Sequence, residues 1–319
     1  MQLRAPLSIA CLFYVACGSS TMDNPPPPSA GFSPKPVAEG FTRFVLPTIP
    51  AIGSGSDVQK CQYIAGPSDS DRYVTIVDGQ QSKGGHHIVL YANQKSEPVG
   101  TSRDCTGDDT LSIAFLGAYG GEGNSTGAAP VPEGVAFKLP KGQALMTSTH
   151  FINASQEAVD GQSVLDVKYV DVATVKQVAN NFANLSVAFK IPAGQTASLD
   201  VSCKFTKDLS FFRMANHLHE WGKSAYTEVI RADGKRELLT RNDTWQKEMT
   251  FNFPFATWPL DKLLVIKKGD TVVTHCAWTN TTTRDLTFPD EMCVVFGFYI
   301  PGDGPQVSCV DNNWDGGPP

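Results

Sequence analysis

Short strand-like segments and turn signals follow one another along almost the whole chain, and no segment shows a long amphipathic helical period. Residues 163–172 alternate between apolar and polar side chains, as a half-buried strand does. Residues 226–241 predict a hairpin in which Asp233 and Gly234 supply the positive φ angles of a tight primed turn. Residues 292–300 are apolar and aromatic, which is typical of a buried strand. The pattern predicts an all-β fold built from sandwiches or jelly rolls.

Two similar segments indicate two structural units. Residues 134–143 (GVAFKLPKGQ) and residues 186–195 (SVAFKIPAGQ) share the order Val-Ala-Phe-Lys, apolar, Pro, spacer, Gly-Gln. The similarity predicts a repeated strand and turn, although apolar strands that end in Pro-x-Gly are common in unrelated β proteins. We place a boundary near residue 178, between an N-terminal domain of residues 41–178 and a C-terminal domain of residues 179–319.

The composition limits the class of partner. Hydrophobic residues make up 41% of the 319, which is enough for a core and argues against global disorder. The net charge is −6, and no block of Lys or Arg stands out. Nucleic-acid binding normally needs a basic face, so we expect no nucleic-acid partner. We expect a monomer that acts on small molecules.

The N-terminus reads as an export signal. An apolar run from about Leu7 to Ala16 is too short to span a bilayer, and it ends in YVAC followed by Gly-Ser-Ser. This ending resembles a bacterial lipoprotein cleavage site, so residues 1–17 predict a signal peptide and Cys17 a lipidated residue. The proline-rich residues 18–40 predict an extended tether. We therefore expect a lipid-anchored protein of the bacterial periplasm or cell surface, which meets the membrane only through its anchor.

The cysteines agree with export. Cys11 would leave with the signal and Cys17 would carry lipid, which leaves six cysteines in a compartment that permits disulfides. No CxxC motif is present, so a zinc ribbon or a redox motif is not indicated. The residues by themselves leave the pairing of the six open.

Five of the six histidines fall in three places in the chain. His217 and His219 are two apart, so both side chains project from one face of a strand and can bind one ion. His86 and His87 are adjacent and need a bulge or different ring nitrogens, and Gly84-Gly85 before them permits such an irregularity. His150 stands alone.

Each of these motifs also has a purely structural interpretation, as histidines exposed on a strand or hydrogen-bonded in a core or loop. Their concentration in a histidine-poor chain favours metal ligands, and imidazole suits copper, zinc, iron and nickel. No HExxH or GxSxG motif is present, so neither a zinc protease of that type nor a nucleophile elbow is indicated.

Residues 289–299 (PDEMCVVFGFY) resemble the Asp-Glu-Met-Cys segment of the copper type II, ascorbate-dependent monooxygenases. The other segments follow in the order of that family, from about residue 55 to residue 310. They are GGHHIVLYA (84–92), GVAFKLPKGQALMTSTHF (134–151) and IPAGQTASLDVSCKF (191–205), which leads into ANHLHEWGK (215–223).

The resemblance implies two tandem antiparallel jelly-roll-like β-sandwich domains, each with one copper ion. It implies that an electron-transfer copper is held by His86, His87 and His150. It implies that the copper that meets O2 and substrate is held by His217, His219 and Met292, which would be the catalytic set. The implied reaction inserts one atom of O2 at a C–H bond and reduces the other to water, with single electrons from ascorbate or a substitute. The disulfides it implies are Cys61–Cys105, Cys203–Cys309 and Cys276–Cys293.

Two positions depart from the peptide-amidating members of this family. Those members hold the carboxylate of the peptide with an arginine two residues before the HxH motif and a tyrosine four residues after the methionine. Here these positions are Ala215 and Phe296. Arginine is the natural bidentate partner of a carboxylate, so its absence argues against a peptidylglycine substrate.

Two other functions remain open from the sequence. A non-catalytic copper-binding or trafficking lipoprotein would bind metal without ascorbate-dependent consumption of O2. A degenerate β-sandwich binding module would bind no metal at all. The presence of all five histidines together with Met292 argues against the second.

Overall fold

The computed structural model describes residues 31–67, 69–93, 97–106, 109, 113–120, 131–250, 252 and 254–315. The predicted signal peptide, Cys11 and Cys17 lie outside the described residues. As predicted, the fold is all-β, and two short 3-10 turns are described beside the strands. No helix in the described part of the chain is long and apolar enough to span a membrane.

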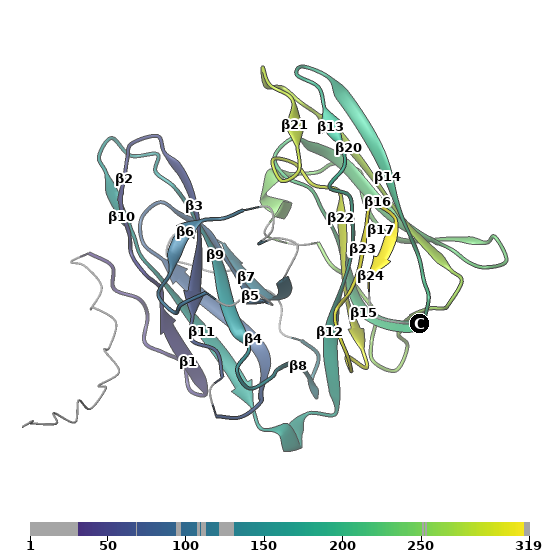
Figure 1. Ribbon diagram of the computed structural model, residues 1–319, viewed down its shortest axis with the longest axis horizontal. Helices are drawn as coiled ribbons and strands as arrows, with labels where there is room; N and C mark the ends of the chain where they lie inside the picture. Colours follow the sequence, from purple (N-terminus) through teal and green to yellow (C-terminus); the bar gives the residue numbers. More distant parts are fainter. Residues whose placement is uncertain are drawn as a thin grey trace, which may run out of the picture.

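The strands form two groups, one from each half of the chain, which lie side by side in Figure 1. The first group is β1 (Phe41–Val45), β2 (Ile49–Ile52), β3 (Asp57–Ile64), β4 (Arg72–Gln81), β5 (Gly85–Asn93), β6 (Ser102–Asp104), β7 (Ile113–Gly120), β8 (Val135–Leu139), β9 (Ala144–Ile152), β10 (Val159–Gly161) and β11 (Ser163–Val170). The turn η1 (Val172–Thr174) connects the groups.

The second group is β12 (Gln177–Leu185), β13 (Lys190–Ile191), β14 (Thr196–Lys204), β15 (Leu209–His217), β16 (Gly222–Ile230), β17 (Arg236–Asn242), β18 (Ala256–Thr257), β19 (Leu264–Ile266), β20 (Thr271–Thr279), β21 (Leu286–Thr287), β22 (Val294–Ile300), β23 (Val307–Val310) and β24 (Asn313–Asp315). The turn η2 (Lys247–Thr250) lies between β17 and β18.

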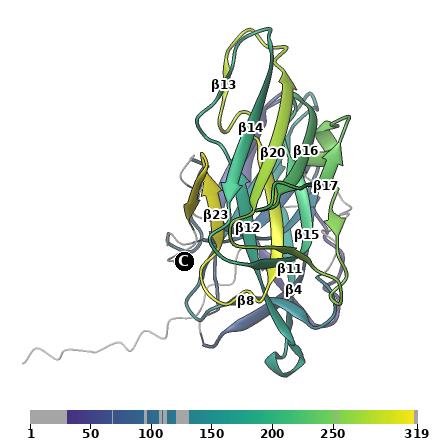
Figure 2. The same ribbon diagram turned by 90° about the vertical axis from the view of Figure 1, so that its right-hand side faces the viewer.

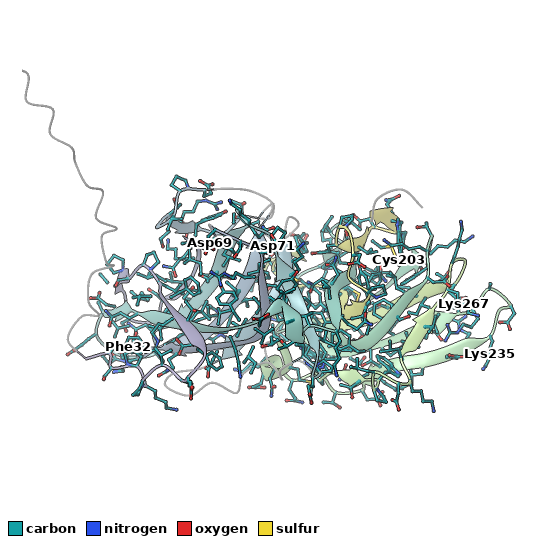
Figure 3. The ribbon with its side chains drawn as sticks, turned by 90° about the horizontal axis from the view of Figure 1, so that it is seen from below. Phe32, Asp69, Asp71, Cys203, Lys235 and Lys267 are labelled. Carbon is teal, nitrogen blue, oxygen red and sulfur yellow. A yellow bond between two sulfur atoms is a disulfide. The ribbon has the colours of Figure 1, made fainter. Side chains whose placement is uncertain are left out.

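Each group packs as a sandwich. In the first, the sheet β6-β3-β9-β5-β7 lies against strands β1-β11-β4-β8, and their inner faces form one apolar core. In the second, the sheet β14-β20-β16-β17 lies against β12-β22-β15-β18 around a second core. Figure 2 shows the four-stranded sheet in front of β12 and β15. Figure 3 shows Lys235 and Lys267 at the outer end of the second sandwich, and Asp69 and Asp71 on the first.

One large sheet runs through both sandwiches. The first three residues of β12 pair in parallel with β8, and the rest of β12 pairs with β22 and β23. The expected boundary near residue 178 therefore falls within the strand that joins the two halves. The core of the first sandwich also takes in Phe212 and Phe298 from the second, and the Phe298 ring stacks on Phe115.

The position of β22 between the two cores explains why its sequence is apolar without interruption. Alternate residues of a strand project to opposite faces. Val295 and Tyr299 are buried in the core of the second sandwich, whereas Phe298 faces the first. A strand that is covered on both faces has no polar face to show.

The structure contains the three disulfides that the resemblance implies, namely Cys61–Cys105, Cys203–Cys309 and Cys276–Cys293. Figure 3 labels Cys203 inside the second sandwich. The third bridge ties β20 to the residue directly before β22. Because Cys293 follows Met292, this bridge fixes the backbone beside a predicted ligand.

The predicted hairpin is present as β16 and β17, but its turn differs from the expected one. The Gly234 N–H donates to the Arg231 carbonyl, and the Arg231 N–H donates to the Lys235 carbonyl. Gly234 alone has a positive φ angle, of 88°, and Asp233 does not. The connection is a three-residue loop with a bulge rather than a tight primed turn, because one left-handed residue suffices for that geometry.

The two similar segments found in the sequence do form equivalent turns. The Gln143 N–H donates to the Pro140 carbonyl, and the Gln195 N–H donates to the Pro192 carbonyl. A long strand follows each turn. The strands before the turns differ, since β8 has five residues and β13 has two.

Candidate metal centres

Three histidines converge at one edge of the first sandwich. His87 on β5 pairs with His150 on β9, and the register of these two strands shifts between Gly85 and His87. This bulge follows Gly84, which has a φ of 80°. The irregularity that the sequence requires is therefore present, and it lets the adjacent His86 and His87 approach His150 together.

The Nδ1 atoms of the three imidazoles form a triangle. His86 Nδ1 lies 3.1 Å from His87 Nδ1 and 3.1 Å from His150 Nδ1, and the third side measures 3.3 Å. A neutral ring nitrogen either donates or accepts, so at least one pair in any such triangle has no hydrogen bond. Two nitrogens bound at about 2.0 Å to one tetrahedral metal ion lie about 3.3 Å apart, so the triangle has the dimensions of a metal site.

Asp57 fixes the orientation of one ligand. His150 Nε2 lies 2.5 Å from the Asp57 carboxylate. A carboxylate accepts, so in the neutral ring Nε2 carries the proton and Nδ1 keeps its lone pair toward the triangle. Carboxylates commonly hold metal-binding histidines in this way. This role of Asp57 could not be predicted from the sequence, because the pairing of β3 with β9 creates it.

Burial favours the neutral form of two of these histidines, His86 and His87. The pKa of His87 lies well below its usual value, mainly because the ring is buried and also because His150 and His86 are close. Burial likewise lowers the pKa of His86. Neutral imidazoles hold free lone pairs at physiological pH, which suits metal binding.

The second candidate set lies at one end of the large sheet. His217 ends β15, and His219 follows it, with ring centroids 5.1 Å apart and perpendicular rings. His219 Nδ1 lies 3.1 Å from the Asp290 carbonyl oxygen. A carbonyl only accepts, so Nδ1 donates and Nε2 is left as the ligand atom. Burial lowers the pKa of both rings, that of His217 strongly.

Glu291 joins the histidine segment to the methionine segment. Its side chain is fully buried, and the Oε2 atom accepts from the His219 N–H at 3.0 Å and from the Met292 N–H at 3.0 Å. The Trp278 Nε1–H donates to the same oxygen at 2.9 Å, and the Trp221 N–H donates to Oε1 at 2.8 Å. Burial raises the pKa of Glu291, and the hydrogen bonds oppose that rise.

The sequence did not identify Glu291 as a functional residue. Its only signal was its place in the DEMC motif, beside a predicted ligand. A carboxylate is rarely buried unless it is hydrogen-bonded. The four donors come from three separate segments, and only the folded chain brings them together.

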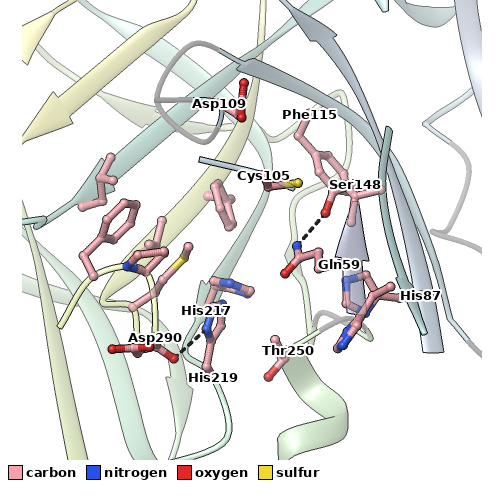
Figure 4. Close-up of a pocket in the computed structure, with 18 of the residues that line it drawn as sticks. Gln59, His87, Cys105, Asp109, Phe115, Ser148, His217, His219, Thr250 and Asp290 are labelled. Carbon is pink, nitrogen blue, oxygen red and sulfur yellow. Dashed lines mark hydrogen bonds between the residues drawn. The ribbon is translucent and has the colours of Figure 1, made fainter. Parts of the chain in front are cut away.

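Both candidate sets line one cavity of about 690 Å³. Its lining includes His86, His87, His150, His217, His219 and Met292. Figure 4 shows His217 and His219 on one side of the cavity and His87 on the other. The pKa of His87 is also lowered by His219 and His217, because their protonated rings would repel a positive charge on His87. The two sets of side chains therefore lie close enough for a charge on one to affect the other.

The donors fit copper. The first set offers three imidazole nitrogens in a triangle of suitable size, and among His, Cys, Asp and Glu clusters in the described residues it is the group that could hold a metal ion. The second set offers two imidazoles and a thioether. Imidazole binds both copper oxidation states, and a soft thioether favours Cu(I).

The sixth histidine lies apart from the cavity. His275 on β20 lies 2.6 Å from the Asp200 carboxylate and stacks on the Tyr226 ring. The contacts of His275 with Asp200 and Tyr226 are those of a structural residue.

Similarity to known structures is weak. PNGase F, a glycosylasparaginase from Flavobacterium meningosepticum, has a TM-score of 0.41 and 11% identity, over 82% of this chain and 96% of that chain. The major capsid protein P2 from bacteriophage PM2 has a TM-score of 0.27 and 8% identity, over 81% and 97% of the chains. At such scores neither similarity bears on function. Among curated proteins, none matches the chain.

The sequence comparison with protein families is more specific. Residues 180–313 match the family described as copper type II ascorbate-dependent monooxygenase, C-terminal domain. The matched range contains His217, His219, Glu291 and Met292. For this part of the chain, the match supports membership of the copper type II ascorbate-dependent monooxygenase family.

Proposed function

We propose that the protein is a copper-dependent monooxygenase that hydroxylates a C–H bond of a small organic substrate, with O2 and a one-electron donor such as ascorbate. The observation that carries the proposal is that two sets of copper-type ligands, from opposite sandwiches, line one cavity. The family match over residues 180–313 supports the same chemistry.

In this proposal His86, His87 and His150 hold the electron-transfer copper, and His217, His219 and Met292 hold the catalytic copper. Bound copper would supply single-electron transfer and activation of O2. The chain itself orients the ligands. Asp57 fixes the His150 ring, the Asp290 carbonyl fixes the His219 ring, and Glu291 holds the backbone of His219 and Met292 in one arrangement.

The roles of the two domains and the location of the protein in the cell are part of the same proposal. Residues 41–178 form the electron-transfer domain and residues 179–319 the catalytic domain of a monomer. The three disulfides are consistent with export. A lipid anchor at Cys17 would hold the chain on a membrane, in the bacterial periplasm or at the cell surface. Mass spectrometry of the N-terminal peptide tests whether Cys17 carries lipid.

Metal analysis and EPR of copper-loaded protein test the ligand sets. We expect two type II copper ions per chain, and one each in His87→Ala and His219→Ala. His275→Ala is the matched control, because His275 lies outside the cavity, and it should keep both. Tight zinc binding without a second copper in any preparation would contradict the proposal.

Oxygen consumption separates catalysis from metal binding alone. We expect ascorbate-dependent O2 uptake by the two-copper protein with at least one member of a panel of small organic compounds, and none by either single-copper variant. Two bound coppers without uptake on any compound would instead favour a copper-binding or trafficking protein.

A further inference from the structure

One side of the cavity is a floor made by four neighbouring strands. The register aligns His217 on β15 with Val294 on β22, Val294 with Leu185 on β12, and Leu185 with Val310 on β23. All four side chains line the cavity. Adjacent strands lie about 4.8 Å apart, so this row extends about 14 Å from His217.

A second row lies beside the first. It aligns Ala215 with Phe296, Phe296 with Ala183, and Ala183 with Ser308. Phe296, Ala183 and Ser308 line the cavity, and the Phe296 ring centroid lies 5.4 Å from that of His217. Because its partners on the neighbouring strands, Ala215 and Ala183, are small, the Phe296 ring projects above them from the floor.

The floor carries no charged side chain. Charged residues line other parts of the cavity, among them Asp57, Glu220, Lys247 and Glu248, but none of them belongs to the strands of the floor. Asp290 and Asp109, which also line the cavity, are each paired with an arginine. Arg284 binds the Asp290 carboxylate through two nitrogens at 2.8 Å each. Arg103 holds both oxygens of the buried Asp109 at 2.7 and 2.9 Å, and this ion pair keeps the pKa of Asp109 well below its usual value.

Part of the wall opposite the floor is apolar as well. Val89 and Tyr91 follow His87 on the same face of β5, and Tyr91 pairs with Met146 on β9 and with Phe115 on β7. All four line the cavity. A charged group placed between these two surfaces would lose hydration without gaining a partner.

A polar group stands where the floor ends. Gln306 directly precedes β23 and lines the cavity, and its Oε1 atom is buried with no hydrogen-bond partner among the described residues. A buried acceptor without a partner raises the free energy of the protein. An N–H or O–H group of a ligand would satisfy it.

We propose, on the basis of the function proposed above, that the substrate is an uncharged, mostly apolar molecule that lies on the β22–β12–β23 floor. Phe296 is the main contact for its apolar body, and Gln306 accepts a hydrogen bond from its far end. The end near His217 is the one presented for oxidation.

Equilibrium binding to the metal-free protein tests this without requiring copper chemistry. Isothermal titration with phenylbutyramide, phenylbutyrate and phenylbutylamine compares a neutral, an anionic and a cationic end on one apolar body. We expect the amide to bind at least about tenfold more tightly than either charged compound. Equal or tighter binding of a charged compound, or no binding of the amide, would overturn the proposal.

Two substitutions locate the ligand. Phe296→Ala should weaken amide binding about tenfold. Phe44→Ala, which removes a partly buried aromatic ring of β1 outside the cavity, should leave it unchanged. Gln306→Met should weaken the amide about fivefold but not butylbenzene, which has no donor. Equal effects of Phe296→Ala and Phe44→Ala would place the ligand elsewhere, whatever the outcome of the copper and O2 experiments.

Discussion

At the scale of single residues, Glu291 joins the segments that carry His219 and Met292 in the second candidate metal site. Four N–H donors from three segments point at one buried carboxylate. A glutamine has the same shape but only one acceptor oxygen, and its NH2 group would face donors. The side chain is therefore not replaceable by its neutral isostere.

We expect Glu291→Gln to lower the free energy of unfolding by about 2–3 kcal/mol, because hydrogen bonds to a charged group are lost in the interior. Urea unfolding of the metal-free protein measures this. Copper titration should also show weaker binding at one site. The control is Glu220→Gln, which changes an exposed neighbour and should cost less than about 0.5 kcal/mol. Equal effects of the two substitutions would contradict this role.

The buried histidines also make the metal-free protein sensitive to acid. The pKa values of His87 and His217 lie well below the ordinary histidine value of about 6.5, mainly because both rings are buried. Below pH 6.5 the unfolded chain binds protons that the folded chain does not, so the free energy of unfolding falls as the pH falls. Each such histidine contributes about 1.4 kcal/mol per pH unit.

Urea unfolding at several pH values below 6.5 checks this. The His217→Asn variant should lose the contribution of one proton from the slope of stability against pH, whatever its absolute stability. Parallel slopes for the two proteins would show that His217 is not held neutral by the fold.

Residue type and spacing drew attention to the histidines as candidate ligands, whereas Met292 and the isolated His150 were assigned only through the resemblance to the monooxygenase family. Asp57 and Glu291 were not predicted, since a carboxylate looks alike in sequence whether it is solvated or buried. Their partners come from strands distant in the chain. Candidate ligands can thus be proposed from the sequence, but the groups that orient them are found only in the fold.

At the scale of the elements, both sandwiches contain the same kind of turn around a buried asparagine. This repeat lies outside the two similar segments, residues 134–143 and 186–195, that were found in the sequence. Asn153 follows β9, and its Nδ2 donates to the carbonyls of Ile52, Gly53 and Glu157. Asn280 follows β20 and donates in the same way to Ile191, Pro192 and Arg284. Ser155 and Thr282 donate back to the respective side-chain oxygens.

Both asparagines stand in an Asn-x-Ser/Thr sequence, and both are buried. We expect Asn280→Ala to lower the free energy of unfolding by about 2–4 kcal/mol, because several backbone carbonyls lose their donor at once. Urea unfolding measures the loss. Thr281→Ala, in the same turn but exposed, should be nearly neutral, and a similar cost for both would contradict a structural role for the buried amide.

The two candidate metal sites do not follow this repeat. The first set lies on β5 and β9, in the five-stranded sheet that ends in the Asn153 turn. The equivalent sheet of the second sandwich contains β16 and β20, and its histidine is His275. The second set lies instead at the junction of β15 and β22. The alternation of apolar and polar residues predicted the strands well. It could not predict which sheet faces the cavity, because that depends on how the two sandwiches pack against each other.

At the scale of the whole molecule, Phe298 links the two sandwiches. Its ring lies 5.9 Å from Phe115 and 5.4 Å from Phe137 in the first sandwich. It lies 6.1 Å from Phe212 and 5.6 Å from Phe255 in the second. Together with the pairing of β8 and β12, this aromatic cluster joins the halves into one packed body.

This packing predicts cooperative unfolding. All five tryptophans lie at or after Trp221, so their fluorescence reports the second sandwich, whereas far-UV circular dichroism reports both. The two transitions should coincide in the wild type. Phe298→Ala should cost about 3–5 kcal/mol and make them diverge. Coincident transitions in the variant would show that the halves do not depend on this ring.

The Cys276–Cys293 bridge bears on the order in which the protein matures. It anchors the segment that presents Met292 to β20, the strand that also supplies Trp278 to Glu291. In a reducing compartment that anchor is missing, and only the hydrogen bonds of Glu291 and the pairing of β22 hold the segment that carries the thioether. For a protein that binds copper as proposed, closing the bridge before copper arrives would place the Met292 sulfur in advance, so we expect oxidation of the two thiols to precede copper binding at this site.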